Sequence, residues 1–233
     1  MSNTMKLSAE TLEILGNFAS IQPNILIQPG ATISTLADAR NIMGTVNLDQ
    51  SFPEKMAIYD LPEFLGVLSL LEDPQLSFTP NAVEIQNGSG TSKAKYHYSS
   101  EDVLTFPSKQ IEPPSADVTF EVSQAVMEKL KKAASVFGHD MIVFKNGSLT
   151  VCSEKQIKSA NSTSDNYYTT SVPTTIVSED LGEFSGVIAI ENFKFVPDDY
   201  TVEVTKAKLA TFTGKNKGVK YFVSMHNESK FGG

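Results

Sequence analysis

A short apolar strand, an amphipathic helix and a β-hairpin recur in this order along the chain, clearly in three copies and weakly in a fourth. In the clear copies the helix-capping residue and the turn of the next hairpin are 22, 21 and 24 residues apart, from Ser8 to Gly30, from Asp60 to Asn81 and from Ser123 to Gly147. A repeated spacing indicates duplicated units that bury their apolar faces against one another. The repeat therefore predicts two pairs of strand–helix–strands units.

Each clear copy has a recognisable helix start. Ser8, Asp60 and Ser123 carry short polar side chains, which accept hydrogen bonds from the first backbone N–H groups of a helix. Apolar residues follow at spacings of three and four, which predicts one buried helix face. On the third helix the predicted buried face consists of Val126, Leu130, Ala133, Ala134 and Phe137.

The fourth copy has convincing strands but a poor helix, because its apolar segment after residues 187–191 ends at Pro197. Tight turns join most consecutive strands, which indicates antiparallel sheets with helices on one face, an α+β fold. Residues 107–116 contain three prolines and little periodicity, so they are read as an extended connector. We expect one domain over residues 1–106 and a second over 117–233.

Charge is distributed unevenly along a chain whose net charge is -8. Residues 1–116 hold 6 basic and 13 acidic side chains, a charge of -7, whereas residues 117–233 hold 13 and 14, a charge of -1. The field of such a protein repels phosphate, so tight binding to free DNA by counterion release is excluded. A role on nucleic acid then requires local basic patches or a topology that does not depend on affinity.

Catalytic and metal-binding patterns are missing from the sequence. The three histidines lie far apart and have no ligand spacing with cysteine or carboxylates. Cys152 lies in an alternating strand pattern without a neighbouring base, which favours a buried thiol over a nucleophile. A single cysteine also fits a reducing cytosol, and no apolar run is long enough for a membrane span. We expect no enzymatic activity, no metal and no cofactor.

Several segments carry a resemblance to a known family. They are residues 5–8, 17–19, 57–61, 64–66, 68–70 and 192–194, with Pro197 and Tyr200. Together they resemble the sliding clamps of large contractile-tailed bacteriophages, and residues 57–61 with the helix after them are the most specific match. The clear resemblance covers about a third of the chain; the rest agrees in pattern more than in identity.

This resemblance implies a DNA-clamp fold with two similar domains, each with two antiparallel sheets outside and two helices inside. It implies a homotrimer that closes into a ring around duplex DNA, is opened and closed by a clamp loader, and tethers the DNA polymerase. It places the protein in the cytoplasm of an infected bacterium. Two other classes stay open: a duplicated β-rich assembly protein with no DNA role, and a hydrolase on a β scaffold.

Helix lysines are the candidates for facing DNA, because the family lines its hole with helices. On the third helix they are Lys131 and Lys132, which are expected to project away from the apolar face, and Lys129 at its flank, with Glu128 among them. Lys194 in the fourth copy and Lys6 in the first complete the set. The other interpretation is an ordinary solvated helix face. Because the first two helices carry mainly glutamates, we expect the second domain to supply most of the positive potential.

Subunit contacts and partner contacts follow from the resemblance. The edge strand of residues 167–172 is expected to meet the end of the first domain of the next subunit. The interface candidates are Tyr167, Tyr168 and Thr170 on one side and Tyr96, Tyr98 and Leu104 on the other. A partner peptide is expected in an apolar pocket beside the connector, formed by Leu36, Met43, Ile111 and Phe222. Ordinary strand or core positions are the alternative for each of these residues. We expect the polar tail, residues 227–233, to be mobile.

Overall fold

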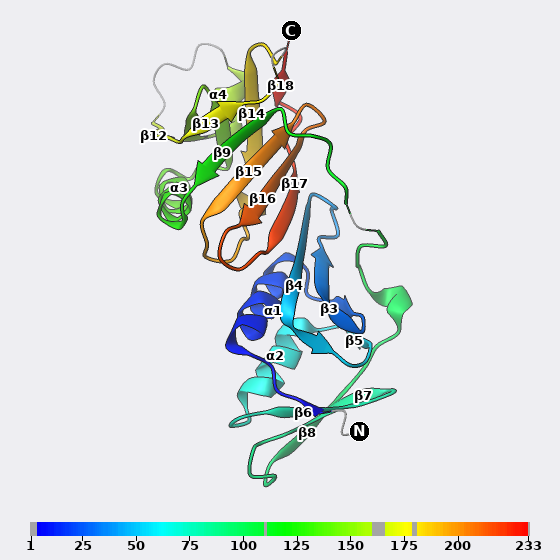
Figure 1. Ribbon diagram of the computed structural model, residues 1–233. Helices are drawn as coiled ribbons and strands as arrows, with labels where there is room; N and C mark the ends of the chain where they lie inside the picture. The colour runs from blue at the N-terminus through cyan, green and yellow to red at the C-terminus, as the bar shows by residue number, and fades with distance from the viewer. Residues whose placement is uncertain (1–3, 110, 160–165, 179–180, 233) are drawn as a thin grey trace. The chain divides into compact units, whose positions relative to one another are not determined.

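The computed structural model describes residues 4–109, 111–159, 166–178 and 181–232, which form two compact units, Met1–Gln110 and Ile111–Gly233 (Figure 1). The elements of unit one are β1 (Thr4–Met5), α1 (Ala9–Ile21), β2 (Ile25–Ile27), β3 (Gly30–Leu36), β4 (Ile42–Phe52), β5 (Met56–Ile58), α2 (Leu61–Ser69), β6 (Gln75–Thr79), β7 (Ala82–Gln86), β8 (Lys93–His97) and the 3-10 turn η1 (Glu101–Val103).

Unit two repeats this order with additions. Its elements are β9 (Val118–Val122), α3 (Gln124–Phe137), β10 (Met141–Lys145), β11 (Ser148–Cys152), α4 (Glu154–Lys158), β12 (Tyr168–Ser171), β13 (Thr174–Ile176), β14 (Phe184–Ala189), the 3-10 turn η2 (Ile190–Asn192), β15 (Tyr200–Thr205), β16 (Leu209–Gly214), β17 (Lys220–Ser224) and β18 (Lys230–Phe231).

The copies within a unit exchange their first strands. In unit one, β1 pairs with β6 of the second copy, and β5 pairs with β2 of the first. In unit two, β9 pairs with β15 and β14 pairs with β10 in the same way. All four pairings are antiparallel. A single copy therefore leaves a sheet incomplete, and the pair is the smallest closed unit.

The predicted caps begin the three helices. Ser8 accepts from the N–H of Thr11 at 3.1 Å, and Asp60 accepts from that of Glu63 at 2.8 Å. Ser123 accepts from the N–H of Val126 at 3.3 Å. In unit one α1 lies beside α2 (Figure 1), and its residue Phe18 is completely buried.

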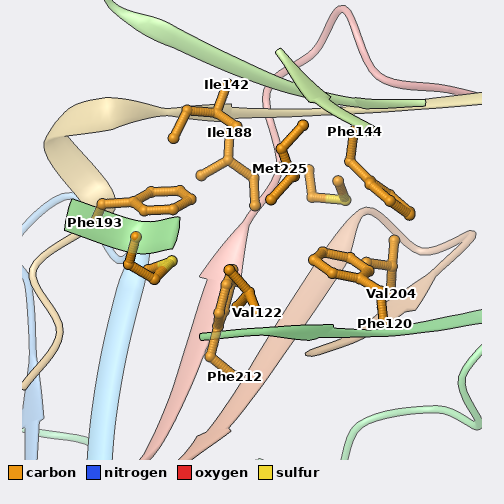
Figure 2. Close-up of a pocket in the computed structure, with 12 residues that line it drawn as sticks. Phe120, Val122, Ile142, Phe144, Ile188, Phe193, Val204, Phe212 and Met225 are labelled. Atoms are coloured by element: carbon orange, nitrogen blue, oxygen red, sulfur yellow. The ribbon is translucent and has the colours of Figure 1, made fainter. Parts of the chain in front are cut away.

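The core of unit two lies between its two sheets. Aromatic and aliphatic side chains from β9, β15 and β16 meet those from β10 and β14 (Figure 2). The rings of Phe120 and Phe144 are stacked with their centres 4.0 Å apart. The void among these side chains measures only about 10 Å³, so the core is closely packed.

The structure differs from the expectations in three places. The buried face of α3 contains Met127 rather than Val126, and Phe137 at its end is 39% exposed. The fourth copy has only the three-residue turn η2, because Ala189 offers no side-chain cap. The described part of the tail, residues 227–232, is ordered by β18, which pairs with β14, so the expectation of a mobile tail was wrong for these residues.

Candidate functional site

The lysines of α3 lie on its solvent side. Lys129, Lys131 and Lys132 are exposed, while the opposite face of the helix is buried. Burial of part of its side chain lowers the pKa of Lys131, and the charge of Glu128 acts in the other direction. Glu128 also accepts a hydrogen bond from Gln124 at 2.8 Å. The helix thus presents a small, mainly positive surface on one face of unit two.

The other two lysine candidates lie elsewhere. Lys194 is exposed in unit two directly after η2, between the buried Phe193 and Phe195. Lys6 belongs to unit one and forms an ion pair with Asp73, which offsets its charge. The exposed side of α1 and α2 carries Glu10, Glu13 and Glu63 instead.

Two sheets end in strands that the sequence had marked as edges. β8 is the last strand of the order β1-β6-β7-β8, and β12 is the first of β12-β11-β10-β14-β18 (Figure 1). Tyr167, directly before β12, is 61% exposed. Tyr168 and Thr170 are half-buried. An end strand leaves backbone donors and acceptors that another strand can pair with.

The unit-one candidates for the subunit interface divide into two kinds. Tyr96 lies on β8, where its hydroxyl donates to the carbonyl of Asp60 at 3.1 Å. Leu104 is buried in a cluster with Leu26 and Ala57, against which Tyr98 packs. Leu104 is only 9% exposed, so its assignment to the interface was wrong: its surface is already used inside the unit.

Tyr98 is held in the same apolar surroundings. Burial, together with the negative charge of Glu54, raises the pKa of Tyr98 to about 12. Its buried hydroxyl has no hydrogen-bond partner among the described residues. Its packing against the Leu26 cluster points to a core role rather than an interface role.

A cleft of about 330 Å³ opens on the outer face of β3 and β4. The residues that line it are Leu26, Gln28, Thr32, Ser34, Met43, Phe106, Pro107, Ser108 and Lys109. Met43, one of the four predicted residues, belongs to this lining, and Leu36 is its cross-strand neighbour. Leu26 was missed because it lies in a run of three buried apolar residues, β2, which does not tell which face of the strand meets a cleft. Phe106 was missed because it lies outside any helix or strand and follows no periodicity.

Two predicted pocket residues do not line this cleft. Ile111 is 38% exposed and belongs to unit two, as does Phe222, which is 6% exposed and pairs within the sheet with Thr211. Phe222 is therefore a core residue, and its assignment to the pocket was wrong. Its strand, β17, has a run of three consecutive apolar residues that are all buried, and such a run is the signal that favours the core.

Hydrogen bonds fix the segment that leads into the cleft wall. The backbone N–H of Thr105 donates to the side chain of Asn24 at 2.8 Å. Its hydroxyl donates to Asp38 at 2.7 Å, and Gln22 donates to the same carboxylate at 2.8 Å. These bonds from Thr105 and Gln22 hold the pKa of Asp38 below its ordinary value. Phe106 consequently has a defined place beside Met43.

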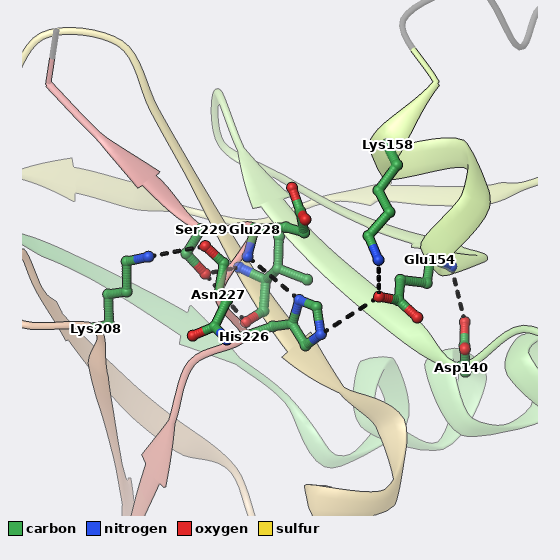
Figure 3. Close-up of polar contacts among 9 residues, drawn as sticks. Asp140, Glu154, Lys158, Lys208, His226, Asn227, Glu228 and Ser229 are labelled. Carbon is green, nitrogen blue, oxygen red and sulfur yellow. Dashed lines mark hydrogen bonds and ion pairs between the residues drawn. The ribbon is translucent and has the colours of Figure 1, made fainter.

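The polar and thiol side chains of unit two that could carry chemistry do not form a catalytic or metal-binding arrangement among the described residues. His226 lies 3.8 Å from Glu154, which also pairs with Lys158 (Figure 3). The thiol of Cys152 is buried, and burial, with the charge of Asp140, raises its pKa to about 11, which disfavours the thiolate. Among the described residues, no group of three or more histidine, cysteine or acidic side chains could hold a metal ion.

The chain is similar over almost its whole length to curated phage proteins. It is 27% identical over 222 residues to a protein named sliding clamp from Vibrio phage KVP40, covering 94% of this chain and 98% of that protein. It is 28% identical over 231 residues to the sliding clamp of Escherichia phage RB69, covering 97% and 98%. No protein-family model matches the chain.

Solved structures show the same fold at low sequence identity. Proliferating Cellular Nuclear Antigen from Entamoeba histolytica superposes with a TM-score of 0.69 at 14% identity, over 97% of this chain and 100% of that one. The Helicobacter pylori beta clamp bound to a DNA ligase peptide gives a TM-score of 0.60 at 16% identity, over 96% of this chain and 66% of that one. The architecture is that of a DNA clamp.

Proposed function

We propose that this chain, a phage sliding clamp by its sequence relatives and a DNA clamp by its fold, encircles duplex DNA and tethers the replicative DNA polymerase for processive synthesis. The observation that carries the proposal is the whole-length similarity to phage sliding clamps together with the duplicated clamp fold. Nothing in the relatives or the fold favours the rival, an assembly protein without a DNA role.

A closed ring explains how so acidic a protein can work on DNA. With a net charge of -8 the chain gains little from neutralising phosphates. A ring stays on DNA because it is topologically linked to it, and weak contacts then permit sliding. The exposed lysines of α3, with Lys194, supply such contacts from unit two. Lys6 contributes less, because Asp73 offsets its charge.

Ring closure assigns a role to the two end strands. We infer a homotrimer in which β12 of one subunit pairs with β8 of the next, because within the described ranges each of these strands is paired on one side only. Tyr96 on one side and Tyr167, Tyr168 and Thr170 on the other are the interface residues in this arrangement. Three subunits close the circle with one kind of contact.

Partner binding is assigned to the cleft beside β3 and β4. Its base is apolar, with Leu26, Met43 and Phe106, and its rim is polar. A short peptide that inserts apolar side chains fits this lining. The related Helicobacter pylori clamp is described as bound to a DNA ligase peptide. We therefore infer that the polymerase and the clamp loader dock here by such peptides.

The remaining expectations follow from this function. We expect no catalytic activity of the clamp itself and no cofactor, and we place its work in the cytoplasm of an infected bacterium. None of the helices in the described ranges combines the length and hydrophobicity that a membrane span requires.

A retention assay tests the function directly. The clamp is loaded with the phage clamp loader and ATP on nicked circular DNA, and half of the sample is then linearised. Clamps should remain on circles and run off linear molecules. Equal retention on both forms, or no retention on circles, would contradict the ring. Light scattering beforehand should give three times the chain mass of 25.4 kDa.

A further inference from the structure

We infer that His139, together with Gln156, holds the ring-closing edge strand in position through the carbonyl oxygen of Asn166. Nε2 of His139 lies 2.7 Å from this oxygen, and Nε2 of Gln156 donates to it at 3.3 Å. The inference rests on the proposed function, because it concerns the strand that is proposed to join two subunits.

The identity of the His139 donor follows from elementary chemistry. A carbonyl oxygen only accepts hydrogen bonds, so Nε2 of His139 must carry the proton in this contact. The imidazole ring is also held in place by Phe137, whose ring is stacked on it with the centres 5.5 Å apart. Gly138 between them ends α3 with φ 67°, a left-handed conformation that turns the chain sharply and suits glycine.

Gln156 is oriented by its own helix. Its Oε1 accepts from the backbone N–H of Ser153 at 2.6 Å, in a capping box at the start of α4. Since Oε1 is used there, the amide nitrogen is the group left to donate to Asn166. The N–H of Glu154 donates to Asp140 at 3.0 Å, which ties the start of α4 to the residue after His139.

The two donors use both lone pairs of the Asn166 carbonyl. Asn166 stands two residues before β12, which begins at Tyr168 opposite Val151. The end of α3 and the start of α4 thus define where the edge strand begins. One side of β12 is paired with β11, and in the proposed ring the other side receives the next subunit. A strand whose start is fixed loses less conformational freedom when it pairs.

Two substitutions separate the hydrogen bond from the stacking. His139→Phe keeps an aromatic ring against Phe137 but has no donor, whereas His139→Gln keeps an N–H donor and loses the ring. We expect His139→Phe to raise the dissociation constant of the subunit interface about 3- to 10-fold, the effect of one hydrogen bond. His139→Gln should keep most of the wild-type affinity between subunits, because it retains a donor.

Thr201→Val is the matched control. It removes one side-chain hydrogen bond, from the Thr201 hydroxyl to Glu121 at 3.0 Å, in the sheet of unit two that does not contain β12. It should leave the dissociation constant unchanged. Thermal unfolding of each variant at a concentration where wild type is monomeric reports any general loss of stability.

The measurements are the mass distribution at nanomolar concentration and the rate at which labelled subunits exchange between rings. Faster exchange and earlier dissociation for His139→Phe alone support the inference. Wild-type behaviour of His139→Phe, or equal effects of His139→Phe and Thr201→Val, would overturn it. If wild type itself never forms a trimer, it is the proposed ring that fails, and this is established before any variant is compared.

Discussion

Single side chains in this protein act mainly through charge and hydrogen bonding at a few positions. The lysines of α3 are exposed and bear no ion pair with any described residue, so their ammonium groups are available to phosphate. Asp198 is the opposite case, since it is 3% exposed and fully engaged by neighbouring donors. In the proposed function the lysines contact DNA, whereas Asp198 holds a loop in shape.

Lysine removal on α3 is expected to weaken contact with DNA. The triple change of Lys129, Lys131 and Lys132 to Ala should reduce the yield of clamps loaded onto circular DNA by roughly 10-fold at physiological salt, because the phosphate contacts that help the open ring capture DNA are lost. A matched triple, Lys145, Lys155 and Lys220 to Ala, removes the same charge outside α3. Both variants should remain trimeric in light scattering. Equal loading yields for the two triples would remove α3 from the DNA-facing surface.

Asp198 is expected to stabilise unit two by holding the turn between β16 and β17. It accepts from the backbone N–H of Asn216 at 3.0 Å, from its side chain at 2.6 Å and from the N–H of Lys217 at 2.9 Å. Burial raises the pKa of Asp198, but these hydrogen bonds outweigh it, so the pKa is lowered overall. Asp198→Asn should cost about 1–3 kcal/mol in the free energy of unfolding near neutral pH.

The pH dependence of this effect has a definite sign. A carboxyl whose pKa is lower in the folded state contributes stability above its unfolded value, about 3.9, and loses it as the pH falls through the folded value. The difference between wild type and Asp198→Asn should therefore be constant from about pH 7 to about pH 5 and shrink toward about pH 3. Urea titrations at these pH values measure it. If the difference in the free energy of unfolding between wild type and Asp198→Asn grew in acid, the stabilising role of the Asp198 carboxylate would be contradicted.

Elements are held together by the strand exchange and by close packing of helices on sheets. In unit one α1 approaches β4 closely enough that Gly44 has no space for a side chain. A Cβ atom there would lie 2.8 Å from Cε1 of Phe18 and 3.2 Å from Cγ2 of Thr35. Because Phe18 is completely buried, its ring has no room to move away.

Gly44→Ala is therefore expected to destabilise unit one by about 1–3 kcal/mol, the usual cost of overpacking. Gly16→Ala is the matched substitution on the exposed side of α1, where a Cβ meets nothing within 4 Å. It should stabilise the protein by about 0.5–1 kcal/mol, because alanine is the better helix former. Denaturant unfolding measures the free energy of unfolding of both variants. An unchanged value for Gly44→Ala would show that α1 can shift to make room for the added methyl group.

The exposed helix faces of the two units differ in the sign of their charges, and in the proposed ring this difference governs how the molecule meets DNA. The exposed face of α1 and α2 carries glutamates, while that of α3 carries lysines. In the proposed ring these faces alternate around the hole, so attractive and repulsive segments follow one another. Net affinity for the duplex then stays low, which favours sliding over stationary binding.

Neutralising the acidic segments should strengthen binding. The double change Glu10→Gln and Glu63→Gln is expected to raise the affinity for duplex DNA at low salt roughly 3- to 10-fold, with six fewer negative charges per trimer. The control is Glu112→Gln with Glu203→Gln, which changes net charge equally away from α1 and α2. Fluorescence anisotropy with a labelled duplex measures both. Equal gains would mean that only the net charge matters.

Much of the local structure could be predicted from residues close together in the sequence. Ser8, Asp60 and Ser123 cap helices because the donors they satisfy lie only three residues away. Asn146 and Gly147 form the hairpin turn with φ 50° and 70°, values that these residue types tolerate. The repeat itself predicted duplicated units for the same reason, since each copy shows its own periodicity and turns.

Tertiary structure alone decided which surfaces are used and which are covered. Leu104 and Phe222 were assigned to contacts with partners, yet both are buried, because neighbours distant in sequence cover them. The exchange of β1, β5, β9 and β14 between copies, the Asn166 anchor and the cleft at Met43 also join residues far apart in the chain. Periodicity indicates that a helix or strand has an apolar face. Only the packed fold determines which residues that face contacts.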